Sequence, residues 1–296
     1  MTVLKIRRVA VPGLLFALTL LFTMVIGVQY HVSFYDVSLP AGRGFWAFLS
    51  QHPAAWLWGL SYSLPLLGIL LVHEMGHFLA CRRHGIESTL PHFLPAPTLI
   101  GTFGAFIKIR SPFSSKKALF DVGLAGPLAG FLAALPVIAL GISRSRLVEP
   151  GALAGGLTLG EPLLFTLLVR LLLGAVPAGR ELLVHPMAFA GWFGLLATAF
   201  NLFPIGQLDG GHILYSLLGR KRAYLAGIAA VVVLAVLGVL FWQGWLLWAL
   251  LATLIGLRHP PIFEEERLGA GRKALAAAAL LVFILSFTPA PLAVAP

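Results

Sequence analysis

The sequence predicts an all-α polytopic membrane protein with about six to seven transmembrane helices and one short β-hairpin that dips into the membrane. Three observations predict this class. Hydrophobic residues make up 59% of the 296 residues and charged residues only 11%, whereas soluble domains carry about 25% charged residues. Apolar runs of the length that crosses a bilayer recur along the chain. Lys and Arg lie between these runs, which is the pattern of membrane-flanking charge.

Seven runs are candidate membrane spans, because each approaches or exceeds the roughly 20 apolar residues that a spanning helix needs. The run at residues 187–218 is too polar at its end to be one plain helix. In residues 161–175, the central Arg170 favours an interfacial or re-entrant helix over a full span. The "WQGW" at residues 242–245 predicts a tight hairpin with interfacial tryptophans. The seven runs are residues 11–29, 54–80, 118–142, 187–218, 223–241, 244–257 and 273–289.

The charge of the chain fits a membrane better than a nucleic acid. The net charge is +10, but the basic residues flank apolar runs instead of covering a polar folded surface, so no nucleic-acid partner is expected. With the N-terminus in the cytoplasm, most of the 21 Lys and Arg residues fall on the cytoplasmic side. The single cysteine, Cys81, excludes an internal disulfide framework.

Residues 86–117 are too apolar for a simple loop between two spans. Within them, "GTFGAFIKIR" at residues 101–110 alternates apolar with polar or small residues, and "SPFSSKK" follows. This alternation predicts a short β-hairpin or strand pair beside the second span, dipping into the membrane surface. Irregular backbone at that depth requires protein or a wet cavity to satisfy its polar groups.

The second span carries His73-Glu74-Met75-Gly76-His77, which fits the pattern His-Glu-x-x-His. Residues i and i+4 share one face of a helix, so both imidazoles can bind one Zn²⁺ while Glu74 acts on a bound water. The alternative is a helix with two chance histidines. Ionisable side chains are costly inside a membrane and usually mark a functional site there, which favours the metal site.

A catalytic zinc site takes three protein ligands and leaves one position open, so a third ligand should exist. Most of the 11 carboxylates are explained by a solvated run, by connecting segments or by capping at expected helix starts. Asp209 remains, in an apolar context that Pro204 and Gly206 interrupt, where backbone groups can face a cavity. It is the candidate third ligand, and a kink with a polar lining is the alternative. The explained carboxylates are Glu264, Glu265 and Glu266; Asp36, Glu87, Glu149 and Glu181; and Asp121 and Glu161.

Together, "HEMGH" and "NLFPIGQLDGG" resemble the site-2 protease family of intramembrane zinc metalloproteases. The second motif of that family is Asn-x-x-Pro-x-x-x-x-Asp-Gly, and Asn201, Pro204, Asp209 and Gly210 match it at the same spacing. The flanking "GTFGAFIKIRSP" and "DVGLAGPLAGF" resemble the branch with bacterial and plastid-type members. Many bacterial members insert a PDZ domain between core spans, and this chain has none. The resemblance covers about residues 55–260.

The resemblance implies a role for each matched position. His73, His77 and Asp209 would hold one Zn²⁺, and Glu74 would be the general base. Asn201 would hold the substrate backbone or the developing oxyanion. The family also suggests that the hairpin pairs with an extended substrate strand, as free strand edges do. The residues expected to make that pairing are Gly101, Thr102, Phe103 and Gly104.

The implied function is that of an intramembrane zinc metalloendopeptidase, which cleaves single-span membrane proteins in or near the bilayer during regulated intramembrane proteolysis. We expect a multi-pass protein of a bacterial cytoplasmic (inner) membrane with a cytoplasmic N-terminus. Residues 1–52 should form a retained signal-anchor helix and an external loop, because their apolar run is too long for a cleaved signal peptide. Residues 53–222 should form the catalytic core with both zinc motifs, and residues 223–296 the C-terminal transmembrane helices.

Two rival functions come from other classes. A metal-ion or solute transporter would also place His and Asp inside the membrane, but it gives no reason for Glu74 between two ligands. A zinc enzyme acting on a lipid or a small molecule is the second rival. The sequence leaves the substrate, the cleavage site and the oligomeric state open.

Overall fold

Four helical stretches are long and apolar enough to cross a membrane in the computed structural model, which describes residues 2–37, 44–149, 151, 157–260, 262 and 266–294. The prediction of a polytopic helical membrane protein is therefore confirmed. The predicted number of six to seven spans exceeds these four. The four stretches are Val9–Tyr35 in α1 (Thr2–Tyr35), Pro53–Arg83, which joins the 3₁₀-helix η1 (Pro53–Gly59) to α3 (Leu60–Arg83), α4 (Lys116–Ile142) and α8 (Arg220–Leu240).

The other helices are shorter. The apolar α9 and α10 have 12 and 17 residues, which at 1.5 Å per residue extend about 18 and 26 Å, less than the roughly 30 Å of a bilayer core. α5 has 11 residues, which agrees with the expectation that this segment does not make a full span. The shorter helices are α2 (Gly44–Gln51), α5 (Leu163–Leu173), α6 (Pro186–Leu202), α7 (Asp209–Leu218), α9 (Gly244–Ile255) and α10 (Ala270–Ser286).

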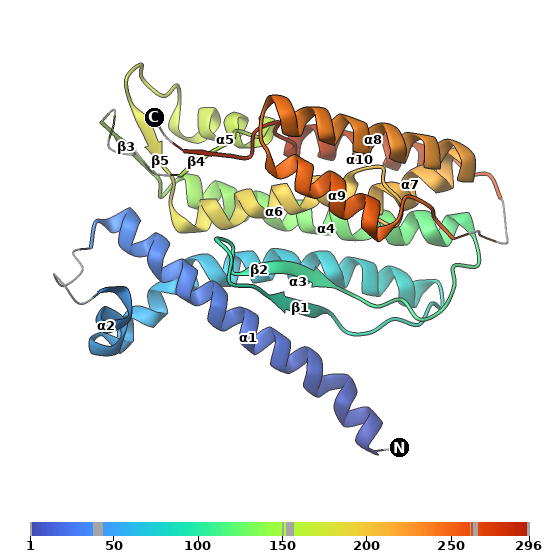
Figure 1. Ribbon diagram of the computed structural model, residues 1–296, viewed down its shortest axis with the longest axis horizontal. Coiled ribbons are helices and arrows are strands. Elements are labelled where there is room, and N and C mark those ends of the chain that lie inside the picture. The colour runs from blue at the N-terminus through green and yellow to red at the C-terminus, as the bar shows by residue number, and fades with distance from the viewer. Residues whose placement is uncertain are drawn as a thin grey trace.

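The helices pack around α4, which contacts α3 on one side and α6 and α7 on the other. Figure 1 shows α4 and α6 between α3 and the group of α8, α9 and α10, while α1 crosses obliquely past the hairpin. Large apolar side chains from α3, α4 and α6 fill the centre, including Leu66, Ile138 and Trp192, all fully buried or nearly so. α3 and α4 are neighbours in this core and make its most extensive helix contact.

The predicted strand pair occupies its expected position. β1 (His92–Pro95) and β2 (Thr102–Phe106) are antiparallel, with His92 opposite Phe106 and Phe93 opposite Ala105. The pair packs against α1 through β1 and against α3 through β2. Its insertion into a membrane surface stays a prediction.

Two further strand pairs were not predicted, so an all-α fold with a single hairpin is an incomplete description. β3 (Arg146–Val148) pairs with β5 (Glu181–Leu183), and β4 (Leu157–Leu159) pairs with β6 (Leu292–Val294), both antiparallel. Each strand has only three residues, which is too short for a visible alternation of apolar and polar residues.

The sequence predicted that residues 187–218 do not form one helix, and the structure confirms this. α6 ends at Leu202, and a turn of six residues through Pro204 and Gly206 leads to α7. The second predicted break also forms, because α8 and α9 make a helical hairpin around Trp242. Trp245 is fully buried, and its indole donates a hydrogen bond to the carbonyl oxygen of Pro289 at 2.6 Å; the interfacial depth of the tryptophans stays a prediction.

Candidate metal centre

Three predicted ligands meet between α3 and α7. His73 and His77 lie one turn apart on α3, and their Nε2 atoms are 3.1 Å from each other. Asp209, the first residue of α7, places Oδ2 3.4 Å from Nε2 of His73 and 3.3 Å from Nε2 of His77. All three residues are buried or nearly so. The structure thus brings together two motifs that are more than a hundred residues apart.

These three side chains fit a zinc ion. Zn²⁺ binds imidazole nitrogen and carboxylate oxygen at about 2.0–2.2 Å in tetrahedral geometry. Two ligands of such a tetrahedron lie about 3.3–3.5 Å apart, which follows from those bond lengths. The observed separations of 3.1, 3.3 and 3.4 Å are close to those of three ligands around one ion. His73, His77 and Asp209 could therefore form a metal site with its fourth position open.

Helix α4 positions both imidazoles. The Nδ1–H of His77 donates a hydrogen bond to the carbonyl oxygen of Val122 at 2.8 Å, which fixes the tautomer and leaves Nε2 free to bind a metal. Gly126 lies against the His77 ring and Gly130 against the His73 ring, so closely that a Cβ atom at either position would crowd the imidazole. The "AGPLAG" at residues 125–130 therefore lets α4 pack closely against α3, and this packing fixes the positions of the two imidazole rings.

The turn before α7 positions Asp209. Gly210 and Gly211 pack against carbonyl oxygens of Leu202 and Gly206, at distances that no Cβ atom could accept. The two glycines after the aspartate are therefore needed for the close return of α7 to the end of α6. Close backbone packing thus explains the glycines of the Asp-Gly-Gly sequence. The same packing places the Asp209 carboxylate beside the two histidines.

Glu74 and Asn201 border the same centre. Glu74 is only 6% exposed, interacts electrostatically with His77 and Asp209, and accepts a hydrogen bond from the backbone N–H of Ile107 just after β2. Asn201, near the end of α6, places its Nδ2 3.3 Å from Nε2 of His73. The structure therefore gathers all five residues that the two motifs supplied.

The four residues expected to pair with a substrate strand lie at the start of β2. Gly101 precedes the strand and packs against Thr23 of α1. Thr102 is buried and donates a hydrogen bond to the carbonyl oxygen of Leu94 at 2.8 Å. Phe103 is 74% exposed, and Gly104 has a φ of 100°, which few other residues adopt. Their pairing with a substrate stays a prediction.

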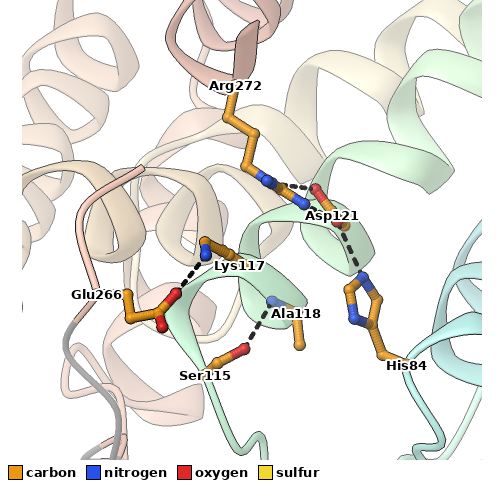
Figure 2. A network of polar contacts seen from close by, with 7 residues as sticks. All are labelled: His84, Ser115, Lys117, Ala118, Asp121, Glu266 and Arg272. Carbon is orange, nitrogen blue, oxygen red and sulfur yellow. Dashed lines mark hydrogen bonds and ion pairs between the residues drawn. The ribbon is translucent and has the colours of Figure 1, made fainter. Parts of the chain in front are cut away.

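Asp121 does not cap a helix, contrary to the sequence expectation. The N-cap of α4 is Ser115, whose hydroxyl accepts a hydrogen bond from the N–H of Ala118. Figure 2 shows instead that Asp121 joins three helices: Arg272 of α10 donates two hydrogen bonds to its carboxylate, at 2.8 and 2.7 Å, and His84 at the end of α3 lies 2.9 Å away. The partners are 151 and 37 positions distant, so no local pattern could reveal them.

Other polar groups have partners that the sequence did not indicate. Glu161 does not cap α5, since its carboxylate accepts a hydrogen bond from the Thr166 hydroxyl at 3.2 Å. Lys117 pairs with the exposed Glu266 (Figure 2), and this contact lowers the pKa of the Glu266 carboxyl. His212, one turn after Asp209 on α7, contacts His259, a pairing that the sequence analysis missed.

Comparison with known proteins identifies relatives. The model of peptidase family M50 matches residues 61–244, more than half of the chain, and includes both motifs. A protein of Arabidopsis thaliana called "Probable zinc metalloprotease EGY1, chloroplastic" is 34% identical over 241 residues, 77% of this chain and 43% of that protein. A protein of the same name from Oryza sativa subsp. japonica is 38% identical over 178 residues, 57% of this chain and 30% of that protein.

A third plant protein, "Probable zinc metalloprotease EGY2, chloroplastic" of Arabidopsis thaliana, is 36% identical over 166 residues, 56% of this chain and 30% of that protein. The chain thus spans less than half of the length of these relatives. No solved structure matches it significantly.

Proposed function

This chain belongs to peptidase family M50, and on that premise we propose that it is a zinc metalloendopeptidase that hydrolyses peptide bonds in or near transmembrane segments of membrane proteins. One observation carries the proposal. The triangle formed by His73, His77 and Asp209 fits zinc, and the buried carboxylate of Glu74 lies beside it. Both histidines and Glu74 belong to the candidate span Pro53–Arg83, so peptide hydrolysis would occur at membrane depth.

Glu74 is the proposed general base. A zinc ion held by the three ligands would lower the pKa of a bound water toward about 7 and polarise the peptide carbonyl. Glu74 would take the proton from the attacking water and later give it to the leaving amine. Its hydrogen bond from the Ile107 N–H would hold the carboxylate toward the centre through both steps.

Asn201 is the proposed oxyanion donor. Its side-chain amide lies beside the imidazole of His73, next to the three candidate ligands. An amide N–H placed there would stabilise negative charge on the carbonyl oxygen as it develops, which is the role of an oxyanion hole. It would also orient the substrate backbone.

The free edge of β2 is the proposed docking strand for the substrate. The backbone N–H and carbonyl oxygen of Lys108 both form hydrogen bonds with Thr89, on the β1 side. Because successive residues of a strand face opposite edges, the N–H of the preceding Ile107 points the other way, toward Glu74. An extended peptide added along this edge would run past Glu74. We infer that Gly101, Thr102, Phe103 and Gly104 begin this docking edge.

The wider assignment follows from the same site. Residues 53–222 hold every proposed catalytic group and would form the catalytic core. The expected partners are the lipid bilayer and single-span membrane proteins, cleaved in regulated intramembrane proteolysis. Membrane location is supported by the four candidate spans. The relatives do not support the expected bacterial cytoplasmic membrane, because they are named as chloroplastic proteins.

The proposal is tested by comparing the wild type with Glu74→Gln, using Glu87→Gln as the control. Glu87 is exposed and outside the centre. Glu74→Gln should retain zinc, measured by elemental analysis of the purified protein, and should no longer cleave a co-expressed single-span substrate. Glu87→Gln should keep both properties. Quantitative proteomics of the membrane fraction would then identify proteins that accumulate only with Glu74→Gln.

The same pair of variants separates a protease from its rivals. A transporter needs no general base, so metal uptake into vesicles that survives Glu74→Gln would refute the protease assignment. Cleavage that persists while zinc stays bound would refute the role of Glu74. A lipid hydrolase would release lipid products from vesicles that contain no protein substrate.

A further inference from the structure

A basic pocket lies at the start of α8, apart from the candidate metal centre. It has a volume of about 300 Å³ and is lined by Arg220, Lys221, Tyr224, Arg258 and His259. Arg220 and Lys221 belong to the first turn of α8, whereas Arg258 and His259 follow α9. Three cationic side chains therefore converge on one cavity from two separate segments.

No carboxylate among the described residues is paired with these three cations. The carboxylates of Asp121 and Glu266 are engaged elsewhere, by Arg272 and Lys117 (Figure 2). A concave site with uncompensated positive charge concentrates anions. A pocket of this charge suits an anionic ligand.

Ring contacts hold the wall of the pocket. The Arg258 guanidinium lies over the Tyr224 ring, 5.4 Å from its centroid, an attractive arrangement for a cation. His259 is buried, and its Nδ1–H donates a hydrogen bond to the carbonyl oxygen of Pro260 at 2.7 Å. Its Nε2 lies 3.0 Å from Nδ1 of His212, at hydrogen-bonding distance. The pocket wall is thereby tied to α7, the helix that begins with the carboxylate ligand.

The position of the pocket indicates which anion it suits. α8 is a candidate membrane span that begins at Arg220, so the pocket lies where the apolar segment starts. Ala223 packs against the cluster that contains Leu119 near the start of α4, so the pocket shares one end of the bundle with the basic segments around Arg82 and Lys117. Phospholipid phosphates lie at this level of a membrane, and basic pockets between membrane helices bind anionic head groups.

We propose that this pocket binds the phosphate-bearing head group of an anionic phospholipid. Arg220 and Arg258 would hold the phosphate oxygens through charge-assisted hydrogen bonds, and Lys221 would add a third positive charge. The acyl chains would lie along the apolar part of α8, where Leu225 and Val232 are exposed. The site is separate from the proposed zinc centre, and its test does not depend on proteolysis.

The test measures lipid retention by native mass spectrometry of the full chain, taken from vesicles of equal parts phosphatidylglycerol and phosphatidylcholine. The wild type should retain phosphatidylglycerol in preference. The double variant Arg220→Gln/Arg258→Gln should bind it on the order of tenfold more weakly, given the worth of each basic residue near an anionic surface. The matched control, Arg222→Gln/Arg267→Gln, removes the same charge at exposed positions outside the pocket and should retain the lipid.

Three outcomes would overturn the proposal. They are a wild type without preference for phosphatidylglycerol, an equal loss in both double variants, and displacement of the lipid by inorganic phosphate at the same concentration, which would identify a free anion as the ligand. Thermal unfolding of each variant reports its folding. If the pocket double variant does not fold, the milder Lys221→Gln should still weaken binding by several-fold, and unchanged binding there would refute the site.

Discussion

Gly126 on α4 lies directly against the imidazole of His77 on α3, so that a Cβ atom at residue 126 would overlap the ring. The same ring is held from its other nitrogen by the carbonyl oxygen of Val122, one turn earlier on α4. One helix thus fixes the orientation of a side chain that its neighbour contributes. The candidate metal centre depends on this helix contact as much as on its own three ligands.

Replacing Gly126 by alanine should therefore weaken zinc binding. The added methyl group would push the His77 ring away from His73 and Asp209. Mutating a residue that orients a metal ligand typically lowers metal affinity by about 10–100-fold. The measurement is zinc content after dialysis against a graded chelator. Gly68→Ala is the matched control, because residue 68 lies on α3 with open space around it. Equal zinc retention in both variants would show that the contact does not position the ligand.

Asp209→Asn and Glu74→Gln should separate metal binding from proton transfer. Asn keeps the size of Asp209 but loses the negative charge, so zinc should leave this variant at lower chelator concentrations. Glu74→Gln should retain zinc, since Glu74 is not one of the three candidate ligands. Both should abolish cleavage of a membrane substrate. Full zinc retention by Asp209→Asn would contradict the ligand assignment.

Chelation of the wild type extends this test. Activity lost with a chelator should return when Zn²⁺ is added back and should not return with Mg²⁺, because imidazole ligands suit zinc and magnesium prefers oxygen ligands. The readout is cleavage of a purified substrate in vesicles. Activity that survives complete zinc removal would exclude a metallopeptidase mechanism.

The sequence predicted the parts of the site whose cause is local. His73, Glu74 and His77 share a helix turn, so their spacing carries the geometry, and Asp209 stands out as a carboxylate among apolar residues. The bond between Asp121 and Arg272 could not be found this way, because a carboxylate near a helix start has an ordinary explanation and its partner is 151 residues distant. The predicted number of spans exceeds the four long apolar helices, because an apolar run does not show how short a helix it will form. The apolar run at 244–257 is cut at Gly256, whose φ of 108° stops α9.

Phe103→Ala should raise the KM for a membrane substrate without changing zinc content or thermal stability. Phe103 is 74% exposed at the start of β2, so its side chain contributes little to the fold and is free to contact an added strand. Leu171→Ala is the control, because Leu171 is 78% exposed on α5. The measurement is the dependence of cleavage rate on substrate density in vesicles. An unchanged KM would remove Phe103 from the docking edge.

Breaking the pair of Asp121 and Arg272 should destabilise the bundle, because it joins the start of α10 to the start of α4 through two short hydrogen bonds. Both side chains are about a quarter to a third exposed, so solvent screening limits the coupling to about 1 kcal/mol. A double-mutant cycle with Asp121→Asn and Arg272→Gln, followed by thermal unfolding in detergent, measures it. The matched cycle with Lys117→Gln and Glu266→Gln should give almost no coupling, because that pair is exposed at the surface. Equal coupling in the two cycles would show that the bidentate contact has no special part in fastening α10 to the core.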